Sequence, residues 1–211
     1  MAANGNGNGG GKAPSQMWED SRSFNVDVDV RRTPRIIKIF GDIGYPDEED
    51  PVAVTALEVT NEIIELVQED HHLPIYVLIN SDGGSVYEGL SMLDAFDNAR
   101  QHGVKIVTRC QGRAQSMGAD LLILGGDWRT ISRNSFIMIH GDWCKSLRLG
   151  DALDVESEMR LREIYQKPII DLYVAKTKLP RKYWEKVMKD LRPVYFTPDE
   201  ALAAGLVDEV F

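Results

Sequence analysis

The stretch PIYVLINSDGGSVYEGLSMLDAF, residues 74–96, decides the fold class. Its first part, Pro74–Asn80, is a short continuous apolar run, which is typical of a strand covered on both faces in a parallel sheet. A turn at Gly83 and Gly84 follows. Apolar residues then recur on one side of a predicted helix: Val86, Leu90, Leu93 and Phe96. A buried strand followed by an amphipathic helix indicates an α/β protein.

The same alternation continues on both sides of this stretch. Strands are predicted over residues 35–40, 104–110, 128–131, 136–139 and 206–211. Helices are predicted over residues 52–70, 116–124, 151–176 and 180–190, the third with a kink at Pro168. A last helix is predicted to begin at a Thr197 cap, with Pro198 next and Glu200 three positions on, and to end at Gly205.

Length and composition predict one globular domain. The chain has 211 residues, of which 43% are hydrophobic and 27% charged, values far from those of a disordered chain. Residues 1–20 are rich in Gly and Asn, without the apolar stretch of a signal peptide, and are predicted to be a flexible tail. Residues 21–211 are predicted to form the single domain.

Charge, hydropathy and cysteine usage exclude several functional classes. The chain carries 24 basic and 33 acidic residues and no basic block, so nucleic-acid binding is not expected. Its longest apolar runs fall far short of the roughly 18 residues of a membrane span. Cys110 and Cys144 have no CxxC spacing, which excludes a zinc knuckle or disulfide scaffold and fits a reducing compartment; we therefore expect a cytoplasmic protein.

Three features lie just beyond the carboxyl ends of predicted strands, where α/β folds bind ligands. They are the Gly83-Gly84 turn, the segment 111–119 and His140. Each also has an ordinary structural interpretation. Paired glycines make turns or cradle phosphates, a serine at a helix start is usually a cap, and a histidine that ends a strand is usually buried and hydrogen-bonded.

The chemical interpretation joins these features into one site. Ser116 would begin a helix among small neighbours, a position that suits a nucleophile. The amides of Met117 and Gly83 could face a developing oxyanion. Histidine titrates near neutral pH, so His140 could serve as general base, whereas His71, His72 and His102 are expected in surface loops.

Four collinear segments resemble the Clp protease proteolytic-subunit (ClpP) family. INSDGG matches the family pattern INSPGG, GRAQSMGADLLILGG matches GxAASMGAxLLxxG, NSFIMIH matches NSxxMIH, and PDEALAAGLVDEV matches AxEAxxyGLVDxI. The resemblance covers most of residues 35–211. It implies the repeated β-β-α units of the ClpP/crotonase-type fold, with a protruding handle helix over residues 151–176.

The resemblance also implies a chemistry. It makes Ser116 the nucleophile, His140 the general base, and the Gly83 and Met117 amides the oxyanion hole of a serine endopeptidase without metal or organic cofactor. The third member of the triad is expected to be Asp190. Counting back from Gly205 places Pro193 where the family has its Asp, so Asp190 could serve only if residues 191–193 form a local insertion.

The implied assembly is a pair of stacked heptameric rings that enclose the active sites in a chamber. Unfolded polypeptides are the implied substrates and a hexameric AAA+ unfoldase the implied partner. Two segments depart from the family: residues 141–145 lack its Pro- and Gly-rich sequence, and residues 25–30 (NVDVDV) replace its apolar axial loop. Docking of an unfoldase is therefore less strongly indicated than peptidase chemistry.

Three other functions remain open at this stage. A crotonase-type acyl-CoA enzyme would share the fold and the paired amides. A non-catalytic ring subunit would share the assembly. A capsid-maturation or other viral peptidase of the same fold would keep the chemistry and differ in its role.

Overall fold

The computed structural model describes residues 35–46, 52–141, 152–190 and 192–211. From Arg35 to Phe211 the chain forms one compact unit. The predicted tail, the NVDVDV segment and Cys144 lie outside the described residues, as does most of the departure at residues 141–145. The single domain predicted over residues 21–211 stays a prediction.

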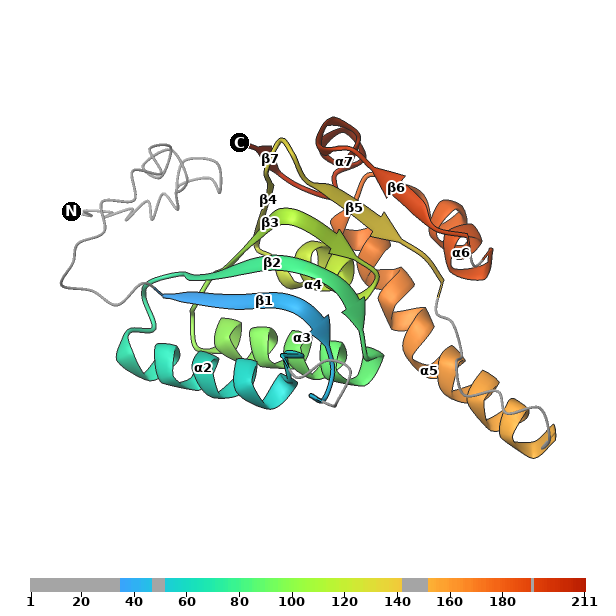
Figure 1. The fold of residues 1–211 in the computed structure, drawn as a ribbon, viewed down its shortest axis with the longest axis horizontal. Coiled ribbons are helices and arrows are strands. Elements are labelled where there is room, and N and C mark those ends of the chain that lie inside the picture. Colours follow the sequence, from blue (N-terminus) through green and yellow to red (C-terminus); the bar gives the residue numbers. More distant parts are fainter. Residues whose placement is uncertain (1–34, 47–51, 142–151, 191) are drawn as a thin grey trace, which may run out of the picture. The chain divides into compact units, whose positions relative to one another are not determined.

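A mostly parallel sheet organises this unit (Figure 1). Its described strands are β1 (Ile36–Ile43), β2 (Ile75–Gly84), β3 (Ile106–Gln115), β4 (Trp128–Ile131), β5 (Phe136–Ile139), β6 (Val194–Phe196) and β7 (Glu209–Val210). The main path runs β1-β2-β3-β4-β7, and β5 pairs with both β3 and β6. Only the β5–β6 pair is antiparallel among the described pairs. The predicted α/β class is confirmed.

The described helices are α2 (Ala56–Glu69), α3 (Val86–Gln101), α4 (Met117–Gly125), α5 (Ala152–Lys176), α6 (Arg181–Lys189) and α7 (Pro198–Ala204). In Figure 1, α2 and α3 run side by side below β1 and β2, whereas the first half of α5 extends away from the sheet. The helix α5 continues through Pro168, and it buries Ile169, Ile170 and Tyr173 in its second half.

Helix α7 begins and ends as its sequence predicts. Thr197 Oγ1 accepts from the Glu200 amide at 3.3 Å, and Glu200 Oε2 accepts from the Thr197 amide at 2.8 Å. Pro198 occupies the first turn, and Gly205 ends the helix with a left-handed φ of 71°. This capping box explains why the PDEALAAG segment forms a helix despite its shortness.

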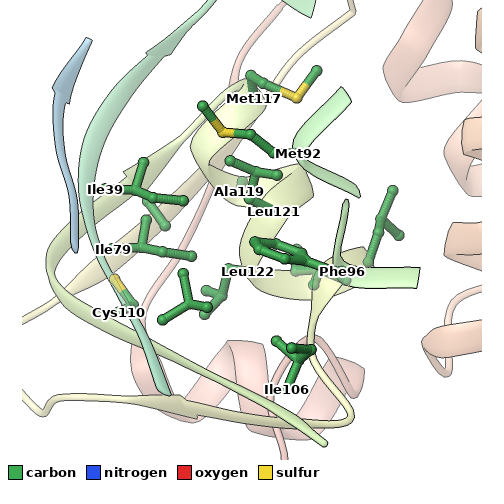
Figure 2. Packing of buried hydrophobic residues seen from close by; sticks show 14 of the residues in the cluster. Ile39, Ile79, Met92, Phe96, Ile106, Cys110, Met117, Ala119, Leu121 and Leu122 are labelled. Atoms are coloured by element: carbon green, nitrogen blue, oxygen red, sulfur yellow. The ribbon is translucent and has the colours of Figure 1, made fainter. Parts of the chain in front are cut away.

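The core lies between the sheet and α3 and α4 (Figure 2). Ile79 and Cys110 contribute from the strands, and Phe96 from α3. All nine residues of α4 except Asp120 are buried, because its MGADLLILG sequence is apolar on nearly every side. Burial of each large apolar side chain stabilises the fold by about 1.5–3 kcal/mol. The helix that follows Ser116 is therefore firmly anchored.

The sheet differs from the predictions in three respects. Strands β1, β2 and β3 run past their predicted ends at residues 40, 80 and 110, as far as residues 43, 84 and 115, and β7 is shorter than the strand predicted over residues 206–211. The prediction that β2 is covered on both faces is wrong for the described residues, because Tyr76 and Leu78 on one face are only half-buried. The short strand β6 was not predicted, because three residues carry too little periodicity to reveal a strand.

Candidate active site

Ser116 has the most unusual backbone in the described part of the chain. It is the N-terminal flanking residue of α4, with φ 51° and ψ −123°, and no other described non-glycine residue has a positive φ. Its hydroxyl makes no capping hydrogen bond, so the ordinary role of a serine at a helix start does not apply. A serine on a strained turn between a strand and a helix is the geometry of a nucleophile elbow.

Glycine at position 83 lets β2 approach this turn closely. A Cβ at Gly83 would lie 2.7 Å from the Ser116 Cβ and 3.1 Å from the Met117 amide nitrogen, and the φ of Gly83 is 100°. Only glycine fits there. The structure thus brings Gly83 together with Ser116 and Met117, although the Gly83 amide itself donates to Ser81 Oγ at 3.0 Å.

His140 reaches the same place from β5. Gln115 of β3 pairs with Met138 of β5, and the Ser116 amide donates to the Met138 carbonyl at 2.8 Å. His140 follows two residues later, is half-buried, and lines one cavity together with Ser116 and Met117. Its Nδ1 lies 2.5 Å from the Gly141 carbonyl oxygen.

The expected third residue, Asp190, lies at the end of the helix that precedes β6. Asp190 is an exposed residue that ends α6, where its amide donates to the Lys186 carbonyl. It is absent from the described residues that line the cavity. In the antiparallel β5–β6 pair, Ile139 is opposite Val194, so the next step of the register sets His140 opposite Pro193. The position found by counting back from Gly205 therefore lies beside His140 and carries no carboxylate.

A cluster of polar side chains borders the Gly83 turn, and the sequence analysis missed it. The Asp82 carboxylate accepts from Arg113 Nη2 at 2.6 Å and also from Arg113 Nε and Gln115 Nε2. These bonds, above all the one from Arg113, hold the pKa of Asp82 below its usual value. The signal lay in the sequence, because Asp82 and Gln115 replace the Pro and Ala of the INSPGG and GxAASMGA patterns.

A second missed feature lies within the cavity wall. Asp120, in the first turn of α4, lines the cavity and accepts a 2.5 Å hydrogen bond from the Tyr173 hydroxyl. Tyr173 is fully buried and stacks on Trp184 with 4.2 Å between ring centroids. Burial, and then the Asp120 charge, raise the pKa of Tyr173 well above its usual value. The phenol therefore stays a neutral donor.

The described residues give no support to a metal site, a membrane span or a reactive cysteine. They include no group of three or more His, Cys, Asp or Glu side chains arranged to hold a metal. None of their helices combines the length and apolar character that a membrane span requires. Burial raises the pKa of the Cys110 thiol to about 12, so this cysteine is not poised to act as a nucleophile.

Comparison with known proteins identifies the family. A model of the Clp protease family matches residues 48–211. An ATP-dependent Clp protease proteolytic subunit of Deinococcus radiodurans is 32% identical over 170 residues, which is 80% of this chain and 78% of the relative. A proteolytic subunit 1 of Prochlorococcus marinus (strain MIT 9312) is 34% identical, with 77% and 80% covered. One from Borreliella afzelii is 31% identical, with 83% and 82% covered. The chain belongs to the Clp protease family.

Proposed function

We propose that this chain is a serine-type endopeptidase in which Ser116 attacks the peptide carbonyl and His140 is the general base. The observation that carries the proposal is the strained Ser116, whose hydroxyl is not used for capping and which shares a cavity with His140. Family membership supports the reaction class, since the relatives described above are named as proteolytic subunits.

The proposed reaction has two steps. His140 takes the Ser116 proton as Oγ bonds to the carbonyl carbon, and it returns that proton to the leaving amine when the peptide C–N bond breaks. Water then attacks the acyl-enzyme with the same base, which releases the carboxylic acid and restores the serine. Neither step transfers electrons to an acceptor or requires a metal.

The Met117 and Gly83 amides are the proposed donors to the oxyanion. The Met117 amide belongs to the first turn of α4, where unpaired N–H groups and the helix dipole favour negative charge. The Gly83 amide already donates to Ser81 Oγ, so it would have to share or exchange this acceptor for the oxyanion. The closeness of Gly83 to Ser116 and Met117 supports a paired-donor arrangement.

Asp190 remains our candidate for the carboxylate that orients His140. It would have to act across residues 191–193, because Pro193 occupies the position beside the histidine. The Gly141 carbonyl, 2.5 Å from Nδ1, offers a neutral acceptor that would fix the same tautomer and leave Nε2 to face Ser116. A serine–histidine pair oriented in this way would work, although more slowly than one with a buried carboxylate.

The proposal extends to a homo-oligomeric chamber of stacked, heptameric rings that admits unfolded polypeptides. Exposed apolar side chains on the first half of α5, Met159 at 62% and Ile164 at 56%, support burial against another copy. The relatives' description as ATP-dependent supports an AAA+ unfoldase as partner. A cytoplasmic location is also part of the proposal, because the two-cysteine composition suits a reducing compartment.

The experiment is intact-mass analysis after incubation with a fluorophosphonate. We expect one adduct per chain, its loss in Ser116→Ala, and its retention in Ser91→Ala, which changes an exposed serine of α3. Loss of casein cleavage in Ser116→Ala alone would follow. No adduct on a well-folded oligomer would favour a non-catalytic subunit, and acyl-CoA binding without an adduct would favour a crotonase-type enzyme.

A further inference from the structure

Three side chains join the Gly83 turn to the Ser116 turn. The Asp82 carboxylate accepts from Arg113 Nε at 2.5 Å and from Arg113 Nη2 at 2.6 Å, so this contact is bidentate. Gln115 Nε2 donates to the same carboxylate. Asp82 directly precedes Gly83, and Gln115 directly precedes Ser116. The cluster therefore links the two segments that carry a proposed oxyanion donor and the proposed nucleophile.

The cluster lies where main-chain pairing between the two strands stops. In the described part of the chain, the register between β2 and β3 ends at the pair Ser81–Ala114. The next residues of β2 pair with β1 on the other side, Gly83 with Asp42. Beyond the last β2–β3 pair, the contacts of Asp82 connect the ends of these two strands.

The donors of the cluster are fixed to the strand that leads to the proposed general base. In the parallel β3–β5 pair, Arg113 is opposite Phe136 and Gln115 is opposite Met138. His140 directly follows β5. The end of β3 thus provides a fixed support, to which the turn at the end of β2 is attached through a carboxylate.

The Gly83 amide is held from the buried side as well. Ser81 is fully buried, and its Oγ accepts from this amide at 3.0 Å. The side chain of Asp82, which is 48% exposed, anchors the same peptide unit from the solvent side. Two anchors on one peptide unit restrict its rotation. An amide that is fixed in advance stabilises a developing negative charge best, because it need not reorganise during the reaction.

We propose that Asp82, Arg113 and Gln115 are positioning residues, whose contacts hold the Gly83 amide in place for the oxyanion that forms when Ser116 attacks. The inference rests on the peptidase function proposed above. The pattern INSPGG has a proline at position 82, which fixes its own φ, whereas this chain restrains the turn with a bidentate ion pair. An exposed ion pair adds little stability, so loss of the cluster should affect kcat far more than folding.

The test measures kcat and KM of peptide hydrolysis for Asp82→Ala, Arg113→Ala and the double variant. We expect each single variant to lower kcat at least about fivefold and to leave KM within about twofold, because a misplaced oxyanion donor weakens binding of the transition state alone. The double variant should be no slower than the slower single variant, since both changes break the same contact. Arg113→Lys keeps a cation without the bidentate fork, so it should lose less kcat than Arg113→Ala.

Asp171→Ala is the matched control. It removes an ion pair between α5 and α6 in which Asp171 and Arg181 are each 48% exposed, and we expect it to keep the native kcat. Asp82→Asn keeps the shape of the side chain without its charge. It should lower kcat in the same direction, and it takes the place of Asp82→Ala if that variant does not fold.

Four outcomes would overturn the positioning role while fluorophosphonate still labels the native chain. They are losses of kcat that add up in the double variant, losses that Asp171→Ala shares, effects confined to KM, and a native kcat in every variant. Absence of labelling and cleavage in the native chain would overturn the peptidase function, and this inference with it.

Discussion

Gly83 lies so close to Ser116 that a Cβ at position 83 would fall 2.7 Å from the Ser116 Cβ. The same Cβ would lie 2.8 Å from the Gln115 carbonyl oxygen, and the φ of 100° is itself unfavourable for any other residue. The approach of β2 to the Ser116 turn thus depends on the missing side chain. It also determines how near the Gly83 amide comes to the proposed oxyanion position.

Replacement of Gly83 by alanine should therefore damage the site more than the fold. The added Cβ would displace the Gly83 amide from the proposed oxyanion position. We expect Gly83→Ala to lower kcat by about 100-fold or more, because loss of one oxyanion donor typically costs that much. Peptidase assays and fluorophosphonate labelling measure the effect. Gly44→Ala is the matched control, because a Cβ at Gly44 meets nothing within 4 Å. Equal activity of the two variants would contradict a role for the Gly83 amide.

The cluster of Asp82, Arg113 and Gln115 predicts a pH-dependent contribution to stability. The pKa of Asp82 is lowered in the folded state, mainly by Arg113, so its contribution is fully present above the unfolded value of about 3.9 and is lost as pH falls through the lowered folded value. Asp82 is 48% exposed, so solvent screening keeps this contribution near about 0.5 kcal/mol.

Urea unfolding of native chain and Asp82→Asn between pH 6 and pH 2.5 tests this prediction. We expect the native chain to be more stable at pH 6 and the difference to disappear at the acid end. High salt should shrink the difference at pH 6 as well. A difference that grows on acidification would have the wrong sign for a carboxylate stabilised by a cation.

The sequence predicts those parts of the site that local patterns determine. The apolar MGADLLILG segment requires a buried helix, so it also places Ser116 at a strand-to-helix junction. The Asp120–Tyr173 contact joins residues 53 positions apart, and no local pattern encodes it. Counting back from Gly205 places Pro193 at the family's Asp position, and strand pairing adds that β6 sets it opposite His140. Contacts of this kind form only when distant segments pack together, so local patterns do not predict them.

The role of Asp190 can be tested against position 193. If Asp190 orients His140, Asp190→Asn should lower kcat at least about tenfold, since loss of an orienting carboxylate weakens a triad strongly. Pro193→Asp in that background should restore part of the loss, because it sets a carboxylate opposite His140. Steady-state peptide hydrolysis measures both effects.

An unchanged rate in Asp190→Asn would show that Asp190 is not the third member. Orientation of His140 would then rest on the Gly141 carbonyl. In that case Pro193→Asp alone should raise kcat above the native value. Lys189→Ala, which changes the preceding exposed residue of α6, controls for disturbance of the helix end.

An ion pair at the other end of the sheet should matter for stability. Arg129 in β4 is buried and donates to both carboxylate oxygens of Asp208, at 2.9 and 2.7 Å, and to the Lys176 carbonyl at 2.8 Å. It thereby ties the segment 205–208, which precedes β7, to the end of α5. Asp208→Ala would leave the guanidinium group buried without its anion, which should lower the free energy of unfolding by about 3 kcal/mol. Denaturant unfolding measures this loss, and Asp199→Ala, which changes an exposed residue of α7, is the control. Equal stability of the two variants would contradict the prediction.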